Sequence, residues 1–361
     1  MCDQGKVMNS KTFDIGEAIF FFFRRFGEKP GAAMWIILWQ MGLVGALSLL
    51  AIIVIGPAYL QMFELLLSTG GKAGAGLSEA EIGRQVLQTF APIFPVMALI
   101  TPVSIIVVLM IQGAWLRFLT RGHVAAGIPF RLGGDEFRLL GVNLLYIAVG
   151  FAAYIGTVIV VIAFAAVMAG IFSMGDVSAG AGMMGGVLAF FGFLALIAAI
   201  IFFVIKLATA PALTVRDEKF RFFESWDATT GVFWNMLLSY VVVAFFSMVL
   251  AITIGTLIQF VFLGAAFPLI QQLIQLAESP GNVAIEQVIE TVLEMLRQPG
   301  VQISLGVGFA MSYLLRIVLE GMWHGVGAYN AVRHRSDRAL EEGDAPVFGK
   351  DHPMGASPSE G

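Results

Sequence analysis

Residues 187–205 read VLAFFGFLALIAAIIFFVI, an uninterrupted apolar run without a single charged residue. A helix needs roughly 20 such residues to cross the hydrocarbon core of a bilayer. A backbone inside that core must satisfy its own hydrogen bonds, so an apolar run of this length is typical of a transmembrane helix. The stretch therefore predicts an integral membrane protein of the all-α class.

The composition of the whole chain agrees with that prediction. Hydrophobic residues make up 58% of the chain and charged residues 13%, whereas a soluble domain carries about a quarter charged residues. Further apolar runs predict a polytopic membrane helical bundle of six transmembrane helices. These spans are expected near residues 32–56, 91–118, 140–171, 185–210, 232–265 and 301–328.

The basic residues predict how the spans are oriented. Seventeen of the 21 lysines and arginines fall in the N-terminal segment, the second and fourth connections and the C-terminal tail. Connections rich in Lys and Arg stay on the cytoplasmic side, and tryptophan favours the headgroup zone. We therefore expect a multi-pass protein of the bacterial inner (plasma) membrane with cytoplasmic N- and C-termini. All six tryptophans lie near the predicted cytoplasmic ends: Trp35, Trp39, Trp115, Trp226, Trp234 and Trp323.

The chain lacks the patterns that most catalytic and cofactor sites need. A single cysteine, Cys2, excludes an internal disulfide and a cysteine-rich metal site. No nucleophile elbow, phosphate-binding loop or dinucleotide fingerprint is present. We expect no enzymatic activity, no metal and no cofactor. The expected partners are membrane lipids and a membrane protein, and not nucleic acid.

Three segments precede the odd-numbered spans, at 13–28, 129–140 and 219–231, and each has polar residues at helical spacing. They are expected to be interfacial amphipathic helices. Two interpretations are open: the segments bind anionic lipid, or they only orient the following span. The second is favoured because their charges are of mixed sign. A tail at 1–12 and a disordered cytoplasmic tail at 336–361 would flank a membrane domain at 13–335.

Similar sequences on either side of the centre predict an internal repeat. Pro57–Gly70 reads PAYLQMFELLLSTG and Pro268–Gly281 reads PLIQQLIQLAESPG, and the two agree at five positions. An amphipathic segment follows each, at 78–90 and 283–297, whereas the middle of the chain has a glycine-rich turn at Ser173–Gly186. The six spans would then be three related hairpins, in units of about 13–122, 129–218 and 219–335.

Three short motifs carry a resemblance to a known family. They are Phe13-x-x-x-Glu17-Ala18 with Phe22 and Phe26, then Trp226-Asp227-Ala228-Thr229, and finally Ala328-Tyr329-Asn330-Ala331-Val332-Arg333. Together they resemble a broad group of bacterial polytopic membrane proteins similar to the membrane domain of glycerophosphodiester phosphodiesterases. The resemblance covers most of residues 13–335 and implies a membrane helical bundle. It implies no phosphodiesterase activity, because the soluble catalytic domain of that family is not among these residues.

Charged residues inside the last span mark the candidate site. Arg316, Glu320 and His324 follow one another at steps of four and so share one helical face. Lys206 falls at a similar depth in the fourth span, and alignment of the predicted repeats places Gln112 at the position that corresponds to Glu320. We expect Lys206 and Glu320 to form an ion pair. The five would form a polar intramembrane site. The alternative is a structural Arg–Glu pair with side chains that extend towards the interface.

These features favour a non-enzymatic role in the bacterial envelope, either lipid binding or scaffolding of a partner. The alternative is a transporter of a small solute or lipid, with a polar path near Arg316 and Glu320. A membrane enzyme ranks third, because too few carboxylates and histidines converge at one interface.

Overall fold

The structure, a computed structural model, describes residues 13–70, 79–91, 93–125, 127–173, 179–278 and 285–341. Within those ranges every regular element is a helix, so the predicted all-α class is confirmed. The described helices are α1 (Ile15–Glu28), α2 (Pro30–Gly70), α3 (Glu79–Phe90), α4 (Ile93–Arg121), α5 (Gly134–Ser173), α6 (Ala179–Leu207), α7 (Ala210–Asp217), α8 (Glu224–Ala228), α9 (Phe233–Glu278), α10 (Ile285–Arg297) and α11 (Pro299–Glu341).

Six stretches of these helices are long and apolar enough to cross a bilayer, which confirms the predicted polytopic bundle. The fourth combines α6 and α7, which are separated by a short break at residues 208–209. The six stretches match the predicted spans one to one. They are Pro30–Tyr59, Ile93–Arg121, Gly134–Gly170, Met184–Asp217, Phe233–Gly264 and Pro299–His334.

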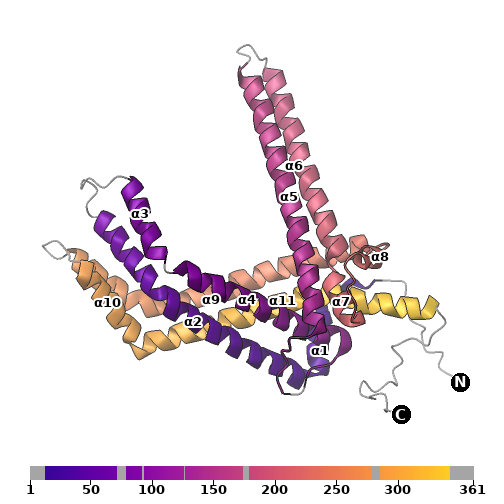
Figure 1. The fold of residues 1–361 in the computed structure, drawn as a ribbon, viewed down its shortest axis with the longest axis horizontal. Helices are drawn as coiled ribbons and strands as arrows, with labels where there is room; N and C mark the ends of the chain where they lie inside the picture. Colours follow the sequence, from indigo (N-terminus) through magenta and orange to yellow (C-terminus); the bar gives the residue numbers. More distant parts are fainter. Residues whose placement is uncertain are drawn as a thin grey trace.

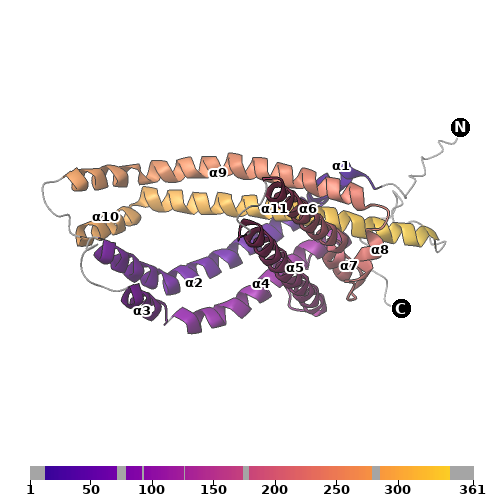
Figure 2. The same cartoon turned by 90° about the horizontal axis from the view of Figure 1, so that it is seen from above.

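The long helices form two groups (Figures 1 and 2). Helices α2, α4, α9 and α11 run beside one another as a body, whereas α5 and α6 form a hairpin that leaves this body at a steep angle. The hairpin contacts α4 and α9 of this body and the short helices α7 and α8. We call the end of the molecule where α4 ends and α5 and α9 begin the base.

Helix α1 is a packed part of the base. The Asp14 carboxylate accepts a hydrogen bond from the Glu17 N–H at 2.9 Å and so caps the first turn. On one face Phe21 and Phe22 are buried in a cluster with residues of α2, α4 and α11, while Phe20 on another face is 56% exposed. The segment 13–28 therefore forms the expected helix, and that helix also supplies core residues.

The other two lead-in segments contain less helix than predicted. Residues 129–133 form a connection, and the rest of the 129–140 segment is the first turns of α5. The 219–231 segment contains only the short helix α8. In the 129–140 segment, the Glu136 carboxylate accepts a hydrogen bond from the Gly133 N–H at 3.0 Å. This capping arrangement fixes the start of α5 at Gly134.

The ends and turns differ slightly from the sequence-based boundaries. Helix α6 already begins at Ala179, inside the predicted glycine-rich turn. Helix α11 continues to Glu341, beyond the predicted start of the disordered tail. The predicted tail at 1–12, and residues 342–361 of the predicted C-terminal tail, lie outside the described residues.

The order of elements has a regularity related to the predicted repeat. A long helix, a short helix and a long helix occur as α2, α3 and α4, and again as α9, α10 and α11. Helices α5 and α6 have no described helix between them. A common origin of the three hairpins stays a prediction.

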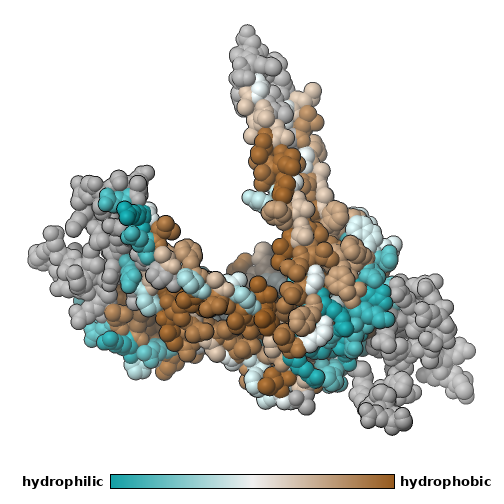
Figure 3. Space-filling view, in the orientation of Figure 1, coloured by the Kyte–Doolittle hydropathy of each residue, from teal (hydrophilic) through white to brown (hydrophobic). Residues whose placement is uncertain are grey.

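Apolar side chains dominate the surface of both groups of long helices (Figure 3). Apolar residues cover the middle of the body and the hairpin, while hydrophilic residues gather at the base and near α3 and α10. Almost none of the apolar stretch of α5 or α6 is buried inside the protein. In water this exposure would be unfavourable, whereas acyl chains cover it in a membrane.

Candidate functional site

The predicted polar face of the last span holds one ion pair within α11. Arg316 Nε lies 2.7 Å from Glu320 Oε1, and the two side chains are 67% and 41% exposed. His324, one turn further along, is half-buried. The structure thus brings Arg316 and Glu320 together, and it places their pair on an exposed face of the helix.

Lys206 and Gln112 do not join that pair. The Lys206 ammonium lies 5.1 Å from the centre of the Trp226 ring and donates to Thr230 Oγ1 at 3.3 Å. The expected Lys206–Glu320 ion pair is therefore wrong: α6 ends one residue after Lys206, where its ammonium meets α8 and its flank. Gln112 accepts a hydrogen bond from Asn143 Nδ2 at 2.9 Å, between α4 and α5.

A buried polar contact that the sequence did not predict joins three spans. Gln40 of α2 is 2% exposed. Its Oε1 accepts a hydrogen bond from Trp115 Nε1 at 2.7 Å, and its Nε2 donates to the Tyr313 hydroxyl at 3.3 Å. These bonds satisfy a polar group that would be costly to leave unpaired in an apolar core. The only signal in the sequence is an isolated glutamine within an apolar span.

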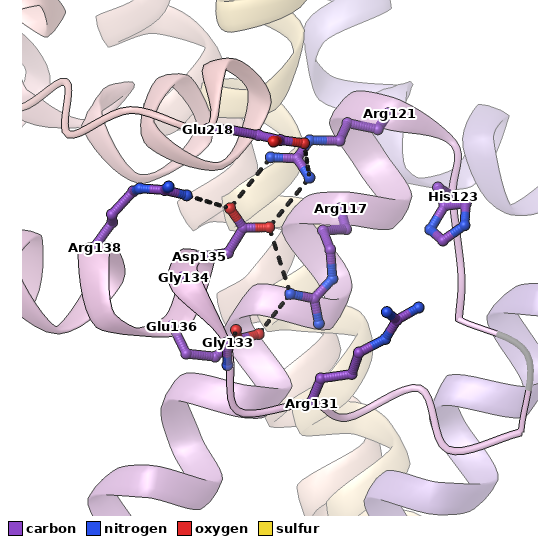
Figure 4. Close-up of a pocket in the computed structure, with 10 residues that line it drawn as sticks. All are labelled: Arg117, Arg121, His123, Arg131, Gly133, Gly134, Asp135, Glu136, Arg138 and Glu218. Atoms are coloured by element: carbon purple, nitrogen blue, oxygen red, sulfur yellow. Dashed lines mark hydrogen bonds and ion pairs between the residues drawn. The ribbon is translucent and has the colours of Figure 1, made fainter. Parts of the chain in front are cut away.

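The base contains a cavity of about 530 Å³, which we call the arginine pocket (Figure 4). The end of α4, the connection after it, the start of α5 and the residue after α7 supply its walls. Ten residues line it: Arg117, Arg121, His123, Arg131, Gly133, Gly134, Asp135, Glu136, Arg138 and Glu218.

One wall of the pocket is a nearly buried ion pair between α4 and α5. Arg117 Nη1 lies 2.5 Å from Glu136 Oε1, and the Glu136 side chain is 1% exposed. Gly113 makes this approach feasible, because a Cβ at that position would lie 2.6 Å from the same carboxylate oxygen. Removing one member of such a pair would leave a buried charge uncompensated.

Asp135 binds three arginines at once. Its carboxylate lies 3.1 Å from Arg121, 3.1 Å from Arg138 and 3.7 Å from Arg117. Glu218, which follows α7, adds an ion pair to Arg121 at 3.1 Å. Asp135 and Glu218 therefore hold the ends of α4, α5 and α7 together by charge.

The pocket still has more positive than negative charge. Four arginines face three carboxylates, and His123 lines the same cavity. Arg131 is exposed, and neither its guanidinium nor the His123 ring has a hydrogen bond or ion pair with any described residue. Figure 4 shows the Arg131 guanidinium apart from the network around Asp135. The planar donor group of arginine matches the oxygens of phosphate and carboxylate.

Apolar side chains lie in the same part of the chain as the pocket residues. Ile128, Leu132 and Phe137 are 56%, 55% and 64% exposed. Trp35 of α2 donates a hydrogen bond from Nε1 to the Gly127 carbonyl at 2.5 Å, which ties the connection to α2. Exposed apolar chains next to tryptophan and arginine are typical of the membrane–water interface.

The segments that carry the family resemblance meet at the base. The Phe13 and Tyr329 rings pack edge to face at 5.2 Å, and Asn330 Nδ2 donates to the Ala228 carbonyl at 3.0 Å. Asn330 and Ala228 are fully buried, so at these positions the motifs contribute packing and hydrogen bonding between elements.

Comparison of the chain with protein-family models, with curated proteins and with solved structures finds no match. Among the described residues no three His, Cys, Asp or Glu side chains form a group that could hold a metal ion. The fold and the composition of the six helices define a class, the multi-pass α-helical membrane proteins.

The sequence contained part of the signal for the arginine pocket. From sequence, all four arginines served as markers of orientation, and Arg131 and Arg138 also lay in the 129–140 segment, for which binding of anionic lipid was the less favoured interpretation. The spacing of Arg117 and Arg121 and the adjacent Asp135 and Glu136 indicate charged faces at the end of one helix and the start of the next. Whether these two charged faces contact each other depends on how the chain turns between α4 and α5. Helical periodicity carries no information about that turn.

Proposed function

We propose that this chain is a non-enzymatic lipid-binding protein of the bacterial inner membrane, with its base and both termini in the cytoplasm. The orientation is supported by the basic segments that contact one another at the base. Lys29 Nζ donates to the Gly122 carbonyl at 2.8 Å, and Arg216 donates to the Ala331 carbonyl. These bonds join the N-terminal segment, two connections and the last helix on the side that is rich in Lys and Arg.

The observation that carries lipid binding is the arginine pocket beside exposed apolar side chains. A lipid has a polar headgroup and acyl chains, so its site needs a charged cavity next to a surface that faces the hydrocarbon. Arg131 supplies a charged group, and the adjacent Leu132 supplies an exposed apolar side chain. The resemblance to a phosphodiesterase membrane domain is compatible with this role and stays part of the proposal.

The alternative roles have less support. A transporter path near Arg316 and Glu320 would need a cavity that reaches them, and these residues do not line the arginine pocket. Their pair also lies on an exposed helix face. Scaffolding would need a protein partner, and no observation identifies the surface that such a partner would bind.

Native mass spectrometry of protein purified in a mild detergent tests lipid binding. We expect adducts of phospholipid mass that survive exchange into fresh lipid-free detergent. Protein that is free of lipid under these conditions would contradict the proposal. A protein partner in place of lipid would favour the scaffolding role.

A further inference from the structure

We propose that the arginine pocket binds the phosphate group of an anionic phospholipid and that Arg131 selects this headgroup. The inference rests on the lipid-binding role proposed above and specifies its ligand. Phosphate is the shared chemistry of such a headgroup and of soluble phosphate, so the experiment must separate the two sources.

Arg131 is the one arginine of the pocket whose charge is not compensated by a carboxylate of the described residues. Arg117, Arg121 and Arg138 are held by Asp135, Glu136 and Glu218 at 2.5 to 3.7 Å. Those arginines shape the cavity, and their positive charge is already compensated. Arg131 has no partner among the described residues, so its guanidinium can bind an anion without the loss of an existing ion pair.

The neighbours of Arg131 add donors on the same cavity. His123 lines it and also has no partner among the described residues. The N–H groups of Gly134 and Asp135, at the positive end of the long helix α5, have no acceptor among the described residues. A phosphate group could accept hydrogen bonds from Arg131 and from such backbone donors together.

The net charge favours an anionic over a zwitterionic lipid. With Arg131 unpaired, the pocket carries one more arginine than carboxylates. A headgroup with one net negative charge neutralises this excess, whereas a zwitterionic headgroup has no net charge and leaves it uncompensated. The exposed Ile128, Leu132 and Phe137 would contact the acyl chains.

The test measures lipid selectivity on the full chain. Protein in mixed micelles of phosphatidylcholine is titrated with phosphatidylglycerol, and native mass spectrometry counts the bound lipids of each kind. The wild-type protein should retain phosphatidylglycerol preferentially. Loss of one basic residue near a membrane surface should weaken this preference about fivefold in Arg131→Gln, and Arg131→Lys should retain most of it.

The matched control is Arg24→Gln, which removes the same charge from the surface of α1. The Arg24 side chain is 59% exposed, and Arg24 does not line the pocket. This variant should change the preference less than twofold. Arg131 is exposed and unpaired, and the ion pairs of Arg24 with Glu17 and Glu28 lie on the surface, where such pairs contribute little to stability. Neither substitution should therefore unfold the protein, and equal melting temperatures would verify this.

The outcomes separate the site from the function. Equal retention of the two lipids, or equal effects of Arg131→Gln and Arg24→Gln, would refute the headgroup site while lipid binding itself could stand. Arg131-dependent binding of inorganic phosphate at concentrations that displace phosphatidylglycerol would overturn the lipid assignment in favour of a soluble phosphate. Wild-type protein that retains no lipid would contradict both proposals.

Discussion

Gly113 and Gly321 each make room for a side chain from another element. A Cβ on Gly113 would collide with the Glu136 carboxylate, and one on Gly321 would collide with the buried Phe22 ring of α1. A residue as small as Gly321 lets a neighbouring element approach its helix closely. The space beside Gly321 is filled by the aromatic ring of Phe22 from α1. The periodicity of the α11 sequence does not specify such a partner.

Gly327 offers a direct test of this close packing. A Cβ there would lie 2.8 Å from the backbone carbonyl oxygen of Ala208, which a side-chain rotation cannot move away. Gly327→Ala should therefore lower the free energy of unfolding by about 1 to 3 kcal/mol. Thermal unfolding in detergent, followed by tryptophan fluorescence, measures this effect.

The control is Gly306→Ala on the same helix, where a Cβ meets no atom within 4 Å. Alanine is the better helix former, so this variant should be neutral or slightly stabilising. Equal destabilisation by the two substitutions would contradict the close approach of α11 to Ala208.

Lys206 and Glu320 should act independently, since Lys206 interacts with Trp226 and Thr230, and Glu320 with Arg316. In a double-mutant cycle, the effects of Lys206→Met and Glu320→Gln on the free energy of unfolding should add within about 0.5 kcal/mol. The matched cycle of Arg316→Met with Glu320→Gln should show coupling. A larger coupling of Glu320 to Lys206 than to Arg316 would support the ion pair that was expected from sequence.

Among the elements, the spans were the most predictable, because crossing a bilayer demands only an apolar run of sufficient length. The lead-in segments were less predictable. Their polar spacing fits a helix on a surface, yet Phe22 of α1 is buried in the base and Asp135 belongs to the first turn of α5. Whether an amphipathic segment covers lipid or protein depends on tertiary contacts that its own residues do not encode.

Tyr146 of α5 joins the two helices of the α5–α6 hairpin. Its hydroxyl donates to the Leu207 carbonyl at 2.6 Å, where α6 ends and that carbonyl lacks the next helical turn. Tyr146→Phe leaves the carbonyl unpaired and should lower the melting temperature, at a cost of about 1 to 3 kcal/mol.

Tyr154→Phe is the matched control on α5, because Tyr154 is 64% exposed and has no partner among the described residues. It should leave the melting temperature unchanged. If the two variants behave alike, the Tyr146 hydrogen bond does not stabilise the hairpin.

At the scale of the molecule, the sequence predicted six spans and grouped most basic residues on one side. It did not predict that the hairpin leaves the body at a steep angle (Figure 1). That angle follows from contacts at the base among α4, α5, α7, α8 and α9, and residues such as Asp135 and Glu218 acquire partners only when these elements meet.

The orientation can be measured with reporter fusions. Alkaline phosphatase, which is active only outside the cytoplasm, should be active when fused after residues 75 and 282 and inactive after residues 219 and 361. The prediction follows from the basic segments that gather at the base. Activity after residue 219, or none after residue 75, would reverse the arrangement.

The contact between α1 and α11 has a consequence for biogenesis. The Asp14 N–H donates to the Tyr329 hydroxyl across 315 residues of chain. At about 5 to 20 residues per second, a ribosome needs roughly 15 to 60 s to synthesise the intervening segment. During that interval the buried face of α1 lacks its main partner. The first of the described helices to emerge is therefore among the last of them to complete its packing, and a nascent chain that stalls before the sixth span would expose Phe21 and Phe22 to quality-control proteases.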